Sequence, residues 1–139
     1  MGDLVSELEG IVGAPNVASG DAIGEDLTHD EALTATAVVP AAVVRPASTE
    51  EVAAVIALAV ARGVPVTARG SGTGLSGACI PQPDGILLSF DRMAEILELD
   101  LDNHVARVQP GVTLARYQES RIRHFHATLD AYMAAGSTG

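Results

Sequence analysis

A glycine-rich segment limits the possible folds of this chain more than any other part of its sequence. Residues 67–81 read TARGSGTGLSGACIP, and residues 72–77 within them form G-x-G-x-x-G, the pattern of a dinucleotide-binding turn. That turn needs a helix directly after the glycines, because the N-terminus of the helix carries the pyrophosphate. Pro81, Pro83 and an Asp-Gly turn follow instead, so no helix of useful length is expected. An NAD-binding site, with Asp91 on the ribose, is therefore the weaker interpretation.

The same segment can cradle an anion without a helix. Its glycines allow successive backbone N–H groups to point toward one place, and its hydroxyl side chains and Arg69 add further donors. No Asp or Glu occurs from residue 67 to residue 83, although the chain has a formal net charge of −10. We predict an anion-binding loop, and the alternative is a mobile surface loop without a ligand.

The flanks of this segment predict a β-α-β unit. Residues 41–45 form a short strand that ends at a proline, and residues 64–68 form a second strand. Between them, Ser48 and Glu51 fit a capping box that starts a helix, and Gly63 suits its end. The apolar face of this helix would consist of Val52, Val55, Ile56 and Ala59. Strand, helix and strand in this order predict parallel strands with a right-handed crossover.

The remaining elements predict an α/β (α+β) fold in which antiparallel strands follow the parallel unit. Residues 3–12 have the apolar spacing of a helix, and residues 13–36 read as irregular. We expect a solvated face for the acids of the irregular part, Asp21, Glu25, Asp26, Asp30 and Glu31. A third strand is expected over residues 86–90, and residues 95–99 and 105–109 would form a hairpin.

The C-terminal segment is predicted to be a helix capped by Thr113. Its apolar residues recur at near-helical spacing: Leu114, Ile122, Phe125 and Leu129. His124 and His126 are two residues apart, so they would point to different sides of this helix and would not share a metal ion. With Cys79 as the single cysteine there is no zinc-ligand set, and we expect Cys79 to be a packed residue. No metal site and no catalytic residue can be named.

Composition excludes several classes of partner. The net negative charge argues against nucleic acid, whose phosphates need a basic surface. A single cysteine cannot form an intrachain disulfide, so nothing points to an oxidising compartment. The longest apolar run, residues 52–61, is shorter than the roughly 20 residues that span a bilayer. We therefore expect a cytoplasmic protein without a transmembrane segment.

Several ordered motifs together resemble a known family. They are R-P-x-S-x-E-E-V from residue 45, V-P-V-T from 64, R-G-x-G-T-x-L-S-G from 69, G-I-x-L-S-x-x-R-M from 85 and V-x-P-G-V from 108. This set resembles the FAD-binding domain of the PCMH-type (vanillyl-alcohol oxidase-like) flavoproteins. Within that family it is most similar to the branch of the glycolate oxidase FAD subunit and FAD-linked D-lactate dehydrogenases. The resemblance covers about residues 25 to 115.

The resemblance implies which residues contact the cofactor. The FAD diphosphate would be lined by the glycine-rich loop, namely Arg69, Gly70, Ser71, Gly72, Thr73, Gly74, Leu75 and Ser76. Gly77 would pass close to the flavin, Pro46 would lie near the adenine, and a turn beside the cofactor would consist of Pro110, Gly111 and Val112. The family's covalent flavin link uses a His in this loop, and no His lies between residues 69 and 85, so FAD would be non-covalent.

The resemblance also implies a function and its limits. The full enzyme would oxidise a 2-hydroxy acid such as glycolate or D-lactate. Residues 1–36 would be an N-terminal helix and irregular segment, residues 37–115 the first part of the FAD-binding domain, and residues 116–139 a divergent helix without the family's usual continuation. We therefore expect a truncated part that is inactive alone.

Two other classes of function stay open. One is a non-catalytic nucleotide-binding or interaction module, and the other is the NAD-binding oxidoreductase. Because 47% of the residues are hydrophobic, a part of a larger domain should expose apolar surface, which predicts self-association or a complementing subunit.

Overall fold

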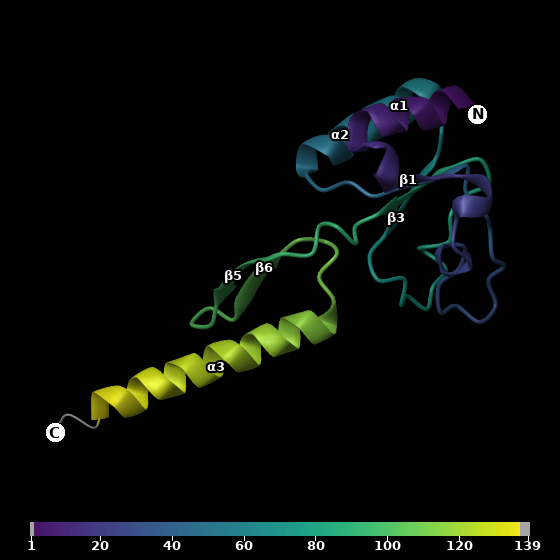
Figure 1. Ribbon diagram of the computed structural model, residues 1–139. Helices are drawn as coiled ribbons and strands as arrows, with labels where there is room; N and C mark the ends of the chain where they lie inside the picture. The colour runs from purple at the N-terminus through teal and green to yellow at the C-terminus, as the bar shows by residue number, and fades with distance from the viewer. Residues whose placement is uncertain (1, 137–139) are drawn as a thin grey trace.

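The structure is a computed structural model that describes residues 2–136. A sheet covered by two helices forms one part of the molecule, and a hairpin with a long helix extends away from it (Figure 1). In chain order the elements are α1 (Gly2–Val12), η1 (Ala14–Asn16), β1 (Val17–Ala18), η2 (Gly20–Ala22), η3 (Glu25–Leu27), β2 (Ala42–Val44), α2 (Thr49–Arg62), β3 (Val66–Arg69), β4 (Ile86–Ser89), β5 (Ile96–Asp100), β6 (Val105–Val108) and α3 (Leu114–Gly136).

The main sheet has the strand order β1-β2-β4-β3. Strands β2, β4 and β3 run parallel, which confirms the predicted parallel unit. The strand β4, which follows the glycine loop in the sequence, lies between β2 and β3 and pairs with both. The two-residue β1 lies within residues 13–36, which we expected to be wholly irregular. It pairs antiparallel with β2.

Helix α2 shows how local sequence sets an element. The Ser48 hydroxyl accepts a hydrogen bond from the Glu51 N–H at 3.2 Å, as the capping box predicts. The Glu51 carboxylate accepts from the Ala47 N–H at 2.7 Å, one residue earlier than the motif requires. Gly63 ends the helix at φ +64°, a conformation that favours glycine.

The core lies on both faces of the sheet. One face packs against α1 and α2, with the buried residues Leu4, Leu8, Val12, Ala42, Val44, Val55, Ala59, Ile86 and Leu88. The other face holds a smaller cluster of Leu27, Val43 and Leu87. Alternate residues of β2 and β4 therefore point to opposite faces, as the two-residue period of a strand requires. The predicted apolar face of α2 is wrong at Ile56, which is 39% exposed and is not among the residues packed against this core.

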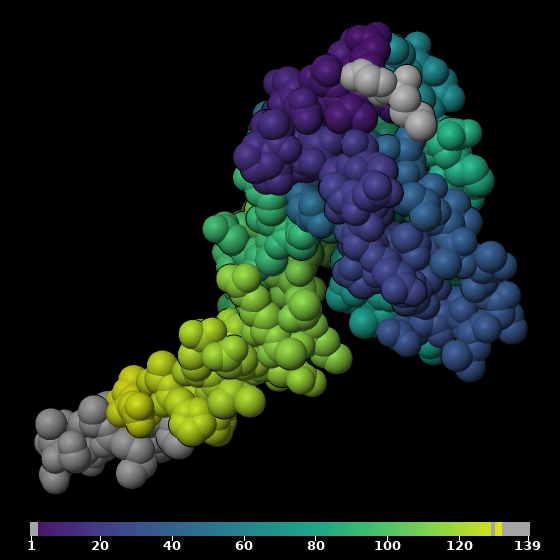
Figure 2. Space-filling view, turned by 45° about the vertical axis from the view of Figure 1, so that its right-hand side comes forward, coloured from purple at the N-terminus to yellow at the C-terminus, as the bar shows by residue number. Residues whose placement is uncertain are grey.

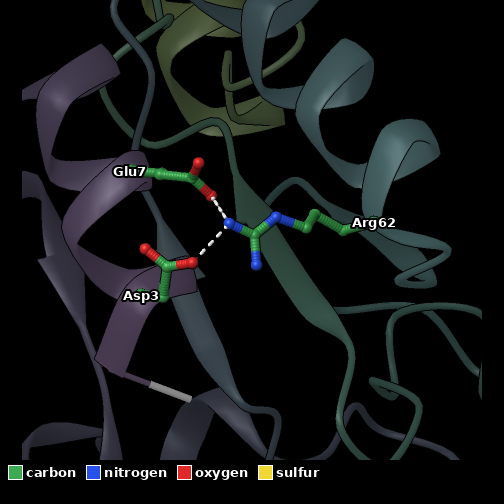
Figure 3. Close-up of polar contacts among 3 residues, drawn as sticks. All are labelled: Asp3, Glu7 and Arg62. Atoms are coloured by element: carbon green, nitrogen blue, oxygen red, sulfur yellow. Dashed lines mark hydrogen bonds and ion pairs between the residues drawn. The ribbon is translucent and has the colours of Figure 1, made fainter.

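A cluster of charges joins α1 to α2. The Arg62 guanidinium donates to the carboxylates of Asp3 at 2.7 Å and Glu7 at 2.5 Å (Figure 3). The hydrogen bond from Arg62, followed by its positive charge, lowers the pKa of Asp3 below its ordinary value. The same two carboxylates raise the pKa of Arg62. The first and second helices are thus linked at the surface above the buried apolar contact.

Strands β5 and β6 form the predicted antiparallel hairpin, and α3 follows it. The Thr113 hydroxyl accepts from the Arg116 N–H at 3.3 Å, so the expected cap is present. Figure 2 shows α3 as an arm that projects from the rest of the molecule. The apolar residues Leu114, Ile122 and Phe125 are exposed on it, while the Leu129 side chain lies outside the described residues.

One acid departs from the predicted solvated face. Asp30 is 6% exposed, and its Oδ1 accepts a hydrogen bond from the Ala32 N–H at 3.0 Å. The other acids of this group are exposed as expected: Asp21, Glu25, Asp26 and Glu31. Asp30 is buried because the segment that carries it packs under the glycine loop.

Candidate functional site

The predicted cofactor-binding segments meet at one edge of the sheet. Parallel strands end at the same edge, and open α/β sheets bind ligands outside the carboxyl ends of their strands. The fully buried Pro46 follows β2, the glycine loop follows β3, and Phe90 follows β4. The Phe90 N–H donates to the Arg69 carbonyl at 3.0 Å, which ties the ends of β4 and β3 together.

The turn at Pro110 and Gly111 lies beside this edge. A Cβ on Gly70 would come within 3.4 Å of the Pro110 carbonyl oxygen. The Gly111 N–H donates to the Met93 carbonyl at 2.8 Å, and a Cβ on Gly111 would collide with the Phe90 carbonyl. A glycine is therefore required at this position, because the turn packs directly on the chain that leaves β4. The following residue, Val112, is half-buried.

The glycine loop, residues 70–77, continues through further turns into β4, and no helix begins in it. The condition for a dinucleotide-binding turn is not met, so the NAD interpretation is wrong. Gly72 and Gly77 have φ values of +74° and +76°, which reverse the direction of the backbone. Within residues 2–136, the N–H groups of residues 71–77 donate no hydrogen bond to another part of the protein.

Most of the loop is exposed around these N–H groups. The hydroxyl groups of Ser71 and Thr73 lie 3.1 Å apart on its surface, and Ser76 is exposed as well. Leu75 is 80% exposed, although it is a large apolar side chain. The loop thus presents N–H donors, hydroxyl groups and one apolar side chain to solvent, without a carboxylate of its own.

Arg69 occupies a place that the sequence does not reveal. Its side chain is directed into the protein, with 8% of the residue exposed. Nη1 donates to the His29 carbonyl at 2.6 Å and Nη2 donates to the Asp26 carbonyl at 2.7 Å. A Cβ on Gly72 would collide with the guanidinium group. Arg69 therefore lies beneath the loop and joins it to the N-terminal segment.

We name residues 26–35 the strap, because this segment runs against the glycine loop. The strap accepts the two hydrogen bonds from Arg69. It also donates one to the loop, from the Glu31 N–H to the Gly74 carbonyl at 3.0 Å. The Ala35 side chain lies 3.7 Å from the position of a Cβ on Gly77. Sequence reasoning missed this packing, because residues 26–35 show no marked periodicity. The only signal was that the T-H-D-E-A run of residues 28–32 lies within residues 25 to 115, the stretch over which the sequence resembles the flavoprotein family.

An open groove lies away from the loop. The side chains of Leu101 and of α3 line this groove of about 590 Å³, namely Gln118, Arg121, Ile122, Phe125 and His126. Among residues 2–136, no group of three His, Cys, Asp or Glu side chains is placed to hold a metal ion. No described helix is long and apolar enough to cross a membrane.

Comparison with known proteins gives a consistent result. Residues 40–138 match the family of FAD binding domains. An uncharacterized FAD-linked oxidoreductase of Mycobacterium tuberculosis H37Rv is 53% identical over 114 residues, or 82% of this chain and 25% of that protein. The D-lactate dehydrogenase of Archaeoglobus fulgidus is 46% identical over 59% of this chain and 18% of its own length. The glycolate oxidase subunit GlcD of Escherichia coli K12 is 47% identical over 52% of this chain and 15% of its own length.

Solved structures share the fold. The 4-ethylphenol oxidase from Gulosibacter chungangensis aligns with a TM-score of 0.78 and 27% identity, over 91% of this chain and 25% of that one. p-Cresol methylhydroxylase aligns with a TM-score of 0.76 and 21% identity, over 88% of this chain and 24% of that one. The chain thus spans about a quarter or less of the length of the relatives that it matches.

Proposed function

Because this chain belongs to the family of FAD binding domains, we propose that its glycine loop holds the diphosphate of FAD and that the chain is the FAD-binding part of a flavin-dependent oxidoreductase. One observation carries the proposal. Within the described residues, the N–H groups of residues 71–77 have no acceptor in the protein, and they lie at the edge where parallel strands end. A diphosphate supplies acceptor oxygens for such a group of donors.

The residues around the loop fit this role. Ser71 and Thr73 add hydroxyl donors at its surface. The turn of Pro110, Gly111 and Val112 borders the same edge, where we propose that it contacts the rest of the cofactor. The fully buried Pro46 would shape this edge from within. Arg69 supports the loop from below through the strap, so its contribution is to hold the loop in place. FAD would be held without a covalent bond, because no His lies between residues 69 and 85.

The substrate that we propose is a 2-hydroxy acid such as glycolate or D-lactate. The names of similar proteins, a D-lactate dehydrogenase and a glycolate oxidase subunit, support this class. When bound, FAD supplies an acceptor for a hydride and the electrons of such an oxidation. Since the chain spans about a quarter of its relatives, we propose that turnover needs residues beyond it, on a complementing subunit or in a longer chain.

Flavin fluorescence tests the proposal. FAD added to the purified chain should lose fluorescence on binding, and ADP should compete, because both ligands carry the diphosphate. Gly72→Ala should weaken FAD binding, since Gly72 has positive φ and a Cβ would displace Arg69. Gly10→Ala is the matched control, because a Cβ on Gly10 meets nothing within 4 Å. A folded chain that binds no FAD, or binds it regardless of ADP, would contradict the proposal.

A further inference from the structure

The strap lies outside the part of the chain that matches the family of FAD binding domains, which begins at residue 40. It nevertheless makes direct contact with the proposed diphosphate loop. The Glu31 N–H donates to the Gly74 carbonyl at 3.0 Å. A trans peptide points its C=O and its N–H in opposite directions. With the Gly74 carbonyl held by the strap, the N–H of Leu75 in the same peptide must point away from the strap.

Asp30 sets the conformation of the strap at this contact. Its Oδ1 accepts from the Ala32 N–H at 3.0 Å, a bond between a side chain and the backbone two residues later. This local turn places Glu31 between its two ends, with the Glu31 N–H toward Gly74. The Asp30 side chain therefore determines where the Glu31 donor lies.

The second oxygen of Asp30 makes this arrangement costly for folding. Within the described residues, Oδ2 is buried and has no hydrogen-bond partner, and it lies 3.6 Å from the position of a Cβ on Gly74. A buried polar atom without a partner destabilises a folded protein. Folding alone would favour an apolar side chain at this position, so the acceptor oxygen that holds the Ala32 N–H points to a role in the adjacent site.

We propose that Asp30 is a positioning residue of the diphosphate site: it holds the Glu31 N–H on the Gly74 carbonyl and so turns the Leu75 N–H outward toward the ligand. This inference rests on the proposed function, since the ligand is the FAD diphosphate. It adds the strap, through Asp30 and Glu31, to the residues that shape the loop. Asp30 itself does not touch the cofactor.

Two substitutions of Asp30 separate this role from a general effect on folding. Asp30→Ala removes the acceptor for the Ala32 N–H, so the FAD dissociation constant should rise about tenfold, the effect of losing one hydrogen bond to a charged group. Its midpoint of thermal unfolding should not fall, because the unpartnered oxygen is removed as well. Asp30→Asn keeps one acceptor oxygen and should bind FAD as the unaltered chain does. Asp21→Ala is the matched control, an exposed acid outside the strap.

Amide hydrogen exchange decides the inference without a ligand. The Glu31 amide should exchange faster in Asp30→Ala and at the normal rate in Asp30→Asn. An unchanged rate in Asp30→Ala overturns the inference, as does a parallel loss of thermal stability and FAD affinity. Equal weakening of FAD binding by both substitutions also overturns it, since the charge and not the acceptor would then matter. If the unaltered chain binds no FAD, the proposed function fails, whereas the exchange rates still decide whether Asp30 positions the loop.

Discussion

At the scale of single residues, Arg69 joins the glycine loop to the strap. Its guanidinium bridges two backbone carbonyls of the strap, and this needs a planar group with several fixed donors. We predict that Arg69→Lys lowers the free energy of unfolding by about 1–3 kcal/mol, because an ammonium group cannot keep both charge-assisted hydrogen bonds to the strap carbonyls. Urea denaturation followed by circular dichroism measures the loss.

The matched control for this change is Arg92→Lys. Arg92 is exposed and makes one hydrogen bond, to the Arg45 carbonyl at 2.8 Å. The same substitution there should alter the free energy of unfolding by no more than about 0.5 kcal/mol. Equal effects at the two positions would mean that the bridge to the strap adds nothing to stability.

Single residues also show where sequence reasoning succeeds. Ser48 and Gly63 act within a few residues of their partners, so local motifs predicted the cap and the end of α2. That Arg69 lines the ligand stays a prediction. The partners of its side chain, carbonyls about 40 residues earlier in the chain, were not predicted. A backbone carbonyl leaves no mark in the sequence, because every residue has one. For the same reason the burial of Asp30 could not be predicted.

At the scale of elements, α1 offers a simple test of helix stability. Gly10 lies in the last turn of this helix, is exposed, and has open space around the position of a Cβ. Gly10→Ala should raise the free energy of unfolding by about 0.5–1 kcal/mol, since glycine loses more backbone entropy in a helix than alanine does. Gly63→Ala should have the opposite sign, because Gly63 has positive φ. Thermal unfolding of both variants checks the two signs.

The contact between α1 and α2 predicts a dependence on pH. The pKa of Asp3 is lowered by the hydrogen bond and charge of Arg62, so its carboxylate stabilises the fold above its ordinary pKa of 3.8. This contribution disappears as the pH falls through the lowered value. Arg62→Gln should therefore unfold at a lower temperature near neutral pH, and the difference from the unaltered chain should shrink below about pH 4.

The appropriate control is Arg123→Gln, which removes an ion pair within α3 alone, with Glu119. It should leave the pH dependence of the unfolding midpoint unchanged. Because Asp3 is exposed, added salt should also reduce the effect of Arg62→Gln. A difference that persists unchanged to pH 2 would show that Arg62 acts through packing and not through its charge.

Elements were easier to predict than their order. The sequence pattern indicated every strand of the parallel unit and the hairpin, because each has a clear apolar run with turn residues on both sides. It did not indicate that β4 lies between β2 and β3, since all three strands are similarly apolar. The two residues of β1 are too few for any pattern. The exposure of Ile56 likewise depends on which helix packs beside α2.

At the scale of the whole molecule, the β5–β6 hairpin and α3 together expose an apolar surface. The groove that includes Ile122 and Phe125 has an open apolar lining, and such surfaces favour association. We predict that the purified chain self-associates in sedimentation velocity experiments as its concentration rises. Phe125→Ser should shift the distribution toward the monomer. Val60→Ser, on an exposed apolar residue of α2, should not, and a clean monomer at high concentration would contradict the prediction.

The position of β4 in the sheet has a consequence for synthesis of the chain. A ribosome releases β2 and β3 before β4, yet neither of these strands hydrogen-bonds to the other in the finished sheet. The growing chain must keep two apolar strands apart until residues 86–89 emerge and join them. During that interval the edges of both strands are open to wrong partners. The glycine loop, which connects β3 to this late strand, gains its final anchor only when translation has passed it.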